Sequence, residues 1–240
     1  MSFDDALRAH YPGALSAERF VVHSQRELAK HGFDEANTIA CVGTCRDELC
    51  VPLRRAVMNA WGEAFNFSSL AGMLLLGTAG FKAAHAHAPV VGGRERYLYV
   101  AMPHIGIAED GSIGTARRVG REGDSTLCGA LVMLGAELAA GPLSLEEDAD
   151  NPELTQLRRK LAPHLQAGTE LPLVELTDVA QRVIEQDLER LIELTVDTAS
   201  ADYAVLTGVQ VHAPGGRTFV RPGLSYACVR GARHELPTPG

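Results

Sequence analysis

The sequence predicts an α/β fold in which short buried strands deliver polar side chains to one edge of a central sheet. The segment Thr38–Val42 is apolar and stops at Gly43, and Arg96–Met102 is rich in aromatic and β-branched residues. Stretches with apolar residues three and four positions apart, which are typical of helices, separate such strands along the chain. Ligands and catalytic groups of open α/β sheets gather at the carboxyl ends of the strands. The residues that follow these two strands are therefore the first candidates for a functional site.

Amphipathic segments mark the predicted helices. Residues 17–30 favour a helix that ends near Gly32, and residues 51–61 favour a second helix with Pro52 near its start. Residues 81–88 and the second half of residues 124–138 are also expected to be helical. We expect an amphipathic helix to open at Asp178, because Asp178 and Gln181 have the spacing of a capping box.

Two further strands, at residues 203–212 and 219–229, close the chain on either side of a turn at residues 214–216. The sequence contains no internal repeat. Its only candidate linker, residues 141–152, is too short to mark a domain boundary. We therefore expect a single domain over residues 1–240.

Composition narrows the classes of function. A net charge of −8 argues against a general nucleic-acid-binding surface, which needs clustered lysine and arginine. No apolar run approaches the roughly 18 residues that a membrane span requires. The first five residues include two aspartates and no lysine or arginine, whereas a secretory signal would begin with basic residues. We expect a cytoplasmic protein without nucleic-acid or membrane partners.

The five cysteines suggest reduced thiols rather than disulfides, because an odd number spread over a mid-sized chain makes a poor disulfide framework. Cys41 lies inside the first apolar strand and is expected to fill the core. Cys45 follows Gly43 and precedes two charged residues, which favours a chemical role. Cys128 is expected in or near a first helical turn, after the good N-caps at positions 124–126, where the helix dipole favours a thiolate.

Cys45, His104 and Cys128 are candidate ligands of a catalytic zinc ion, Zn²⁺. Two thiolates and one imidazole suit tetrahedral zinc and leave a fourth position for water. The metal can lower the pKa of that water to roughly 7, which supplies hydroxide at neutral pH. Asp47 would orient the hydroxide, and Arg46 would keep Asp47 ionised.

Spacing alone does not select this trio, since no short zinc motif links the three residues. His85 and His87 are rival ligands; in the alternative, one is packed in the core or hydrogen-bonded and the other is solvated. His212, at a strand end, is a further candidate that lacks a thiol or carboxylate neighbour in the sequence.

Several segments together resemble the limiting-CO2-inducible protein B/C family. They are Cys45–Glu48, Gly77–Ala84 with His87–Pro89, Pro103–Gly106, Ser125–Ala130 and Asp202–Gln210. That family is similar to β-carbonic anhydrases. The resemblance implies a three-layer αβα fold with a central, largely parallel sheet, zinc on Cys45, His104 and Cys128, Asp47 as the carboxylate partner, and a homodimer.

The sequence departs from the β-carbonic anhydrase pattern at Leu49, where an arginine would pair with the aspartate. Arg46 is the first choice to replace it, and Arg54 and Arg118 are substitutes. His104 and Cys128 are also much farther apart in the sequence than the histidine and cysteine of the β-enzymes.

The expected function is the reversible hydration of CO2 to bicarbonate by zinc-bound hydroxide. One alternative is a catalytically silent family member that binds inorganic carbon or forms complexes. Another is a metal-free enzyme in which Cys45 is the nucleophile and His104 the base.

Overall fold

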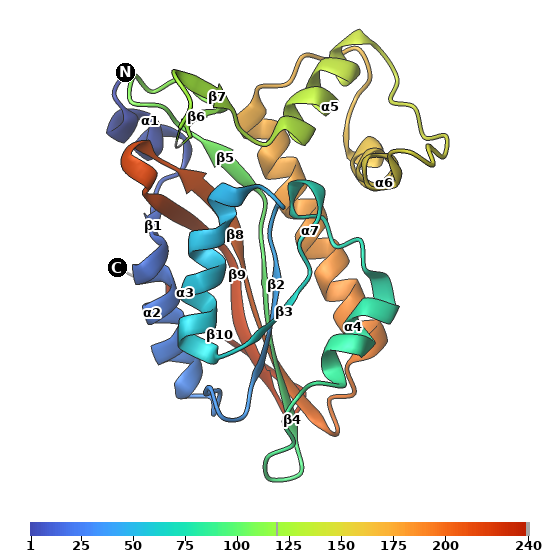
Figure 1. The fold of residues 1–240 in the computed structure, drawn as a ribbon. Helices are drawn as coiled ribbons and strands as arrows, with labels where there is room; N and C mark the ends of the chain where they lie inside the picture. The colour runs from blue at the N-terminus through green and yellow to red at the C-terminus, as the bar shows by residue number, and fades with distance from the viewer. Residues whose placement is uncertain (119, 239–240) are drawn as a thin grey trace.

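The computed structural model describes residues 1–118 and 120–238, and it forms three layers with a mixed sheet between two layers of helices (Figure 1). This arrangement confirms the predicted αβα fold. The helices are α1 (Phe3–His10), α2 (Ala17–Ala29), α3 (Val51–Trp61), α4 (Gly77–His85), α5 (Gly129–Ala140), α6 (Pro152–Leu161) and α7 (Leu173–Thr195). The strands are β1 (Leu15–Ser16), β2 (Ile39–Gly43), β3 (Ala64–Asn66), β4 (Glu95–Ala101), β5 (His104–Gly106), β6 (Thr115–Arg117), β7 (Asp124–Thr126), β8 (Ala201–His212), β9 (Thr218–Val229) and β10 (Ala232–Glu235).

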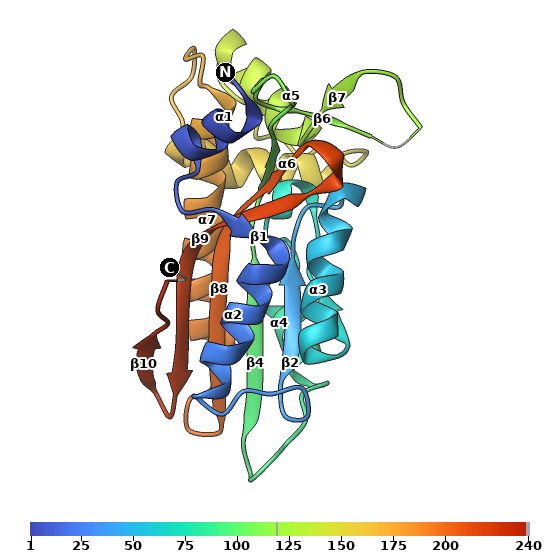
Figure 2. The ribbon, with the colours of Figure 1, turned by 90° about the vertical axis from the view of Figure 1, so that its left-hand side faces the viewer.

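The central sheet is parallel in its middle and antiparallel at one side. Over the described residues its strand order is β1-β9-β8-β4-β2-β3, with β10 added to β9 and β5 added to β8. The strands β3, β2, β4 and β8 run parallel, whereas β9 runs antiparallel to β8. Because β2 and β4 are parallel neighbours, the chain leaves both strands at the same edge of the sheet. Figure 2 shows α5 and the β6–β7 hairpin at that end of the molecule.

Separate apolar cores cover the two faces of the sheet. Helices α2 and α3 contribute Phe20, Leu53 and Trp61 to one core, and all three side chains are at most 2% exposed. Helices α4 to α7 pack on the opposite face, as Figure 2 shows for α4 and α7 behind the strands. Burial of each large apolar side chain stabilises the fold by about 1.5–3 kcal/mol. Both faces of the parallel strands are thus removed from water, which explains their continuous apolar sequences.

The local rules of helix formation account for α3. Pro52 occupies its first turn, where the missing N–H has no helical partner to lose. Leu53, Val57 and Trp61 form the buried face. The helix stops at Gly62, which has a φ of 78° that few other residues adopt.

Two predicted helix starts are wrong. The long helix α7 begins at Leu173 rather than at Asp178, whose carboxylate instead accepts a hydrogen bond from Arg221 at 2.6 Å. The expected N-caps at positions 124–126 form strand β7, which pairs with β6, and α5 begins directly after Cys128. Tertiary pairing overrides a local capping preference in both cases.

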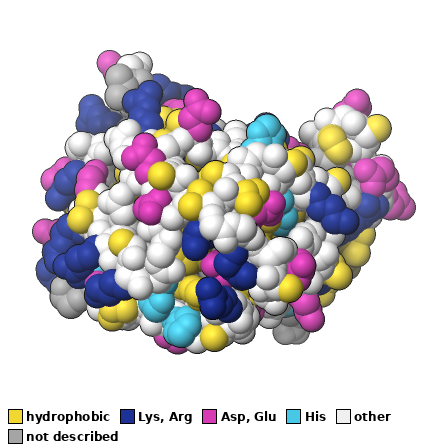
Figure 3. All heavy atoms as spheres, turned by 90° about the horizontal axis from the view of Figure 1, so that it is seen from below, with side chains coloured by type: hydrophobic (Ala, Val, Ile, Leu, Met, Phe, Trp, Pro, Cys, Tyr) yellow, Lys and Arg dark blue, Asp and Glu magenta, His cyan; other side chains and the backbone are white. Residues whose placement is uncertain are grey.

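The end of the molecule that carries the amino ends of the parallel strands has a mixed charge. Lysine and arginine side chains are interspersed there with aspartate and glutamate (Figure 3). Among the residues that the structure describes, no helix combines the length and the apolar character needed to cross a membrane.

Candidate metal centre

The structure brings Cys45, His104 and Cys128 together at the carboxyl edge of the parallel strands. One ligand atom from each residue lies within 4.8 Å of those of the other two. The residues are 6%, 0% and 2% exposed, respectively, so bulk water has little access to the three side chains. Three residues that are distant in the sequence thus form one compact donor set.

Each of the three residues owes its place to a different element. Cys45 lies two residues beyond the end of β2, and His104 opens β5 just after β4. The neighbouring pair Gly43 and Ala101 shows that β2 and β4 end at the same level. Cys128 caps α5 from a left-handed conformation with a φ of 54°, which is strained for a residue with a Cβ and costs on the order of 1 kcal/mol.

Gly72 permits the close packing behind Cys45. Its φ is 78°, and a Cβ at this position would lie 2.6 Å from the Met102 carbonyl oxygen and 3.5 Å from the Cys45 nitrogen. A Cβ atom does not approach a carbonyl oxygen as closely as 2.6 Å, so glycine lets this segment lie against the strand ends without a shift of the backbone. Gly72 therefore fixes the backbone that presents Cys45.

The pKa values of the two thiols are shifted in opposite directions. A hydrogen bond with Cys128 lowers the pKa of Cys45 to about 4, against the effect of burial, and the nearby His104 acts in the same direction. The hydrogen bond with Cys45, together with burial, raises the pKa of Cys128 well above its ordinary value. These shifts favour Cys45 as the first of the two thiols to lose its proton. Cys128 caps α5, as expected, and its role as a second thiolate stays a prediction.

The chemistry of the donors fits a soft divalent metal ion. The Nδ1 atom of His104 lies 3.1 Å from Nε2 of His212. The other nitrogen, Nε2, is buried and has no hydrogen-bond partner within the described part of the chain. A buried nitrogen without a partner is costly, and a cation shared with two sulfur atoms would satisfy it. The group could therefore hold a metal.

Asp47 pairs with Arg118, not with Arg46. Arg118 donates from Nη2 to Oδ2 of Asp47 at 2.7 Å and from Nη1 to Oδ1 at 3.2 Å. Burial alone would raise the pKa of Asp47, but the hydrogen bonds from Arg118 and from the Leu49 N–H lower it below its ordinary value. Arg118, one of the two substitutes considered, thus replaces the arginine that Leu49 cannot supply.

Arg46 faces the other way. Its guanidinium pairs with Glu153 at the start of α6, and its side chain is 62% exposed. The prediction that Arg46 pairs with Asp47 is wrong because adjacent residues leaving a strand point in different directions. Arg118 comes from the β6–β7 hairpin, and no pattern around Cys45 could have indicated it.

His212 lies behind His104 and is more closely tied to the site than its sequence context suggested. Both residues are buried, and Cys50 Sγ lies 3.8 Å from Nε2 of His212. Burial and the neighbouring His104 lower the pKa of His212 to about 3, so the ring is neutral at physiological pH. The contact between His104 and His212 arises because β5 pairs parallel with β8.

His85 and His87 do not join the cluster. His85 is buried, its Nε2 lies 2.6 Å from the Tyr99 hydroxyl, and its ring stacks on Tyr97. His87 is exposed. This matches the alternative in which one imidazole packs in the core and the other is solvated.

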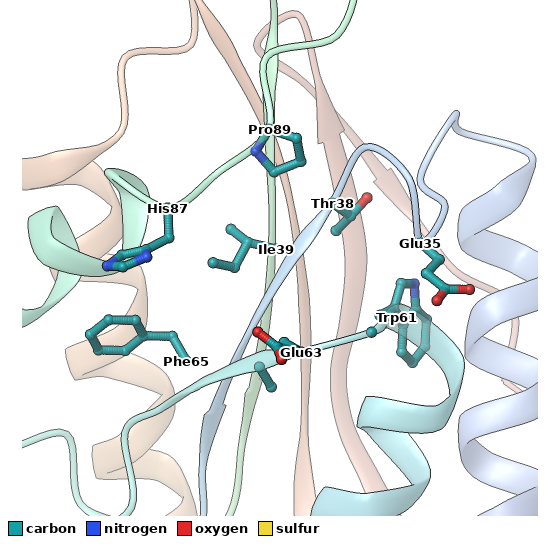
Figure 4. Close-up of a pocket in the computed structure, with 10 residues that line it drawn as sticks. Glu35, Thr38, Ile39, Trp61, Glu63, Phe65, His87 and Pro89 are labelled. Carbon is teal, nitrogen blue, oxygen red and sulfur yellow. The ribbon is translucent and has the colours of Figure 1, made fainter.

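A pocket of about 380 Å³ lies near the opposite end of the sheet (Figure 4). In this view Trp61 and Glu35 lie on one side of Ile39, and His87 and Phe65 lie on the other. Ile39 is the first residue of β2, whereas Cys45 lies beyond its last residue. This pocket is therefore remote from the cluster of Cys45, His104 and Cys128. A larger pocket of about 760 Å³ is lined by Arg118 and by residues of the β6–β7 hairpin, next to the partner of Asp47.

Comparison with known proteins identifies the family and the fold. The family model of the limiting CO2-inducible proteins B/C β-carbonic anhydrases matches residues 14–230. The crystal structure of limiting CO2-inducible protein LCIB shares 34% sequence identity, covers 97% of this chain and 98% of its own, and superimposes with a TM-score of 0.81.

Two more distant structures share the fold. PtLCIB4, a homolog of LCIB, has 23% identity and a TM-score of 0.84, and the match covers 97% of this chain and 98% of that protein. The H88A mutant of PtLCIB4 has 22% identity and a TM-score of 0.85, with 99% of each chain covered. No curated protein matches the chain. The extent of the family match and the identity with LCIB show that this chain belongs to the limiting CO2-inducible protein B/C family, which is β-carbonic anhydrase-like.

Proposed function

We propose that this protein is a zinc-dependent carbonic anhydrase that catalyses the reversible hydration of CO2 to bicarbonate. The observation that carries the proposal is the buried cluster of two sulfur atoms and one imidazole, whose Nε2 has no other partner among the described residues. It occurs in a chain of a carbonic anhydrase-like family. The proposal therefore joins a donor set of this structure with the chemistry for which the family is named.

The donor set favours zinc over harder cations. Thiolates and imidazole are soft or borderline ligands, whereas magnesium and calcium require oxygen. Two thiolates would also neutralise the charge of a divalent ion inside a buried site. When bound, zinc supplies a Lewis acid that lowers the pKa of a coordinated water to roughly 7.

The side chains around the cluster have separate roles. The Arg118 hydrogen bonds keep Asp47 ionised, so both of its side-chain oxygens can only accept hydrogen bonds. An acceptor beside the cluster can hold the proton of the attacking oxygen away from CO2 and leave a lone pair to react. Burial of Cys45, His104 and Cys128 keeps bulk water away from the ligands.

The substrate pair CO2 and bicarbonate and a homodimeric state belong to the same proposal. CO2 is small and apolar and needs no elaborate recognition motif. Light scattering tests the dimer, which has twice the mass of a single chain. A cytoplasmic location without nucleic-acid or membrane partners remains part of the proposal.

Stopped-flow CO2 hydration with zinc-loaded protein tests the function. We expect a rate above the uncatalysed reaction that falls to background in Cys45→Ser and persists in Cys228→Ser, which changes a buried thiol on β9 outside the cluster. A background rate in the parent protein with one zinc per chain would contradict the proposal. That result would favour a family member that binds inorganic carbon or forms complexes without catalysis.

A further inference from the structure

A row of buried side chains extends from the metal-binding cluster into the sheet. Nδ1 of His104 lies 3.1 Å from Nε2 of His212, and Nδ1 of His212 lies 3.3 Å from Oγ1 of Thr218. His104 and His212 are 0% and 3% exposed, and Thr218 is 7% exposed. The row therefore has little access to water that could replace any of these contacts.

The sheet itself holds the row in place. His104 opens β5, which pairs parallel with β8, and His212 is the last residue of β8. Thr218 lies directly opposite His212 in the antiparallel pair of β8 and β9. The two imidazole rings meet edge to face, with centroids 5.2 Å apart and an angle of 80° between their planes. Strand pairing thus places Thr218 opposite His212 and brings His104 onto the neighbouring strand β5.

Only one arrangement of protons suits a metal ligand. If Nε2 of His104 binds a cation, the ring carries its proton on Nδ1, and this N–H must donate a hydrogen bond to Nε2 of His212. The proton of His212 is then on Nδ1, and that N–H donates a hydrogen bond to the Thr218 hydroxyl oxygen. The reverse arrangement places a proton on Nε2 of His104 and blocks ligation.

We propose that His212 is a positioning residue of the metal centre, which accepts a hydrogen bond from the Nδ1–H of His104 and so directs the Nε2 lone pair towards Cys45 and Cys128. This inference rests on the proposed metal binding by these three residues. Histidine ligands commonly donate their second N–H to a carboxylate or a carbonyl. A neutral imidazole in that place orients the ligand without adding negative charge.

Zinc affinity, measured by competition with a chromophoric chelator, tests the inference. We expect His212→Leu to weaken zinc binding about 10- to 100-fold, which is the usual effect of losing such a partner. The protein should still bind one zinc per chain at saturation. His212→Gln restores an acceptor oxygen and should recover most of the affinity. Wild-type affinity in a folded His212→Leu variant would overturn the inference, as would an equal loss in both variants.

Nitrogen-15 NMR of the zinc-loaded parent protein gives a test that needs no variant. We expect the His212 proton on Nδ1 and a bare Nε2, and the opposite tautomer would overturn the inference. Zinc stoichiometry separates two further outcomes. A parent protein that binds no zinc contradicts the proposed function itself. Two zinc ions per chain, with one lost in His212→Leu, would make His212 a ligand together with Cys50 and would also overturn the positioning role.

Discussion

Replacement of Arg118 by methionine should slow CO2 hydration while leaving the zinc in place. The substitution removes both hydrogen bonds to Asp47 but keeps a long apolar side chain at a position that is only 17% exposed. Asp47, which is 13% exposed, would then lie next to the cluster without its cation. Arg118 is not a predicted ligand, so the zinc content should remain near one per chain.

The magnitude follows from the strength of hydrogen bonds to charged groups, about 1.5–3 kcal/mol each. Loss of one such contribution to the ionised, oriented carboxylate corresponds to a decrease of roughly 10- to 100-fold in kcat/KM, since about 1.4 kcal/mol is a factor of ten. Without Arg118, burial raises the pKa of Asp47 unopposed by its main partner. The acid limb of the pH profile should therefore move to higher pH.

Arg118→Met should also lower the free energy of unfolding. The pKa of Asp47 is lowered in the folded protein, so the ion pair stabilises the fold above the pKa of an unfolded aspartate and loses this effect as the pH falls through the folded pKa. Near neutral pH the free energy of unfolding should be lower in Arg118→Met than in the parent protein, and the difference should vanish in acid. Denaturant titration at several pH values measures this effect.

Arg46→Met is the matched control. It removes the same charge from a side chain that is 62% exposed and pairs with Glu153. Its pH profile should match that of the parent protein. A shifted profile in Arg46→Met combined with an unchanged one in Arg118→Met would refute the assignment of Asp47 to Arg118.

Three other predictions concern the ligands and the fold. Cys128→Ser should lose most of its zinc by elemental analysis, whereas Cys41→Ser, inside strand β2, should retain it; retention in Cys128→Ser removes that residue from the ligand set. Gly72→Ala should lower the free energy of unfolding by about 2–4 kcal/mol because its Cβ would lie 2.6 Å from a carbonyl oxygen. Gly77→Ala, at a φ of 58° with open space around it, should cost only about 1 kcal/mol, and equal losses would contradict the packing argument. Asp202→Asn should destabilise the protein by about 2 kcal/mol at neutral pH, because it removes the charge partner of Arg94. The pKa of Asp202 is lowered by Arg94 against the effect of burial, so this loss should disappear as the pH falls through the folded pKa; a loss that persists in acid would point to packing instead.

The strands and the meeting of two of the three candidate ligands were predictable because their signals are local. The apolar run that ends at Gly43 and the segment before Pro103 mark β2 and β4, and parallel pairing brings their ends together. Cys45 and His104 therefore became neighbours for a reason that the sequence displays. The prediction for Cys128 depended on the family resemblance as much as on the expected helix. Its segment follows the β6–β7 hairpin, which no local pattern places beside the ends of β2 and β4.

The partners of the ligands were not predictable in the same way. Arg118 approaches Asp47 from the β6–β7 hairpin, which the sequence presents as a set of helix caps and glycines. His212 meets His104 only because β5 adds to the end of β8, and a register shift of one residue would point it to the other face. Such contacts depend on long-range pairing, which leaves no mark in the neighbouring residues.

X-ray absorption at the zinc edge tests the central claim most directly. A single ion held by Cys45, Cys128 and His104 predicts two sulfur atoms at roughly 2.3 Å and one imidazole nitrogen at roughly 2.0–2.1 Å, with a light atom in the fourth position. A spectrum that shows only nitrogen or oxygen ligands, without sulfur, would contradict the claim.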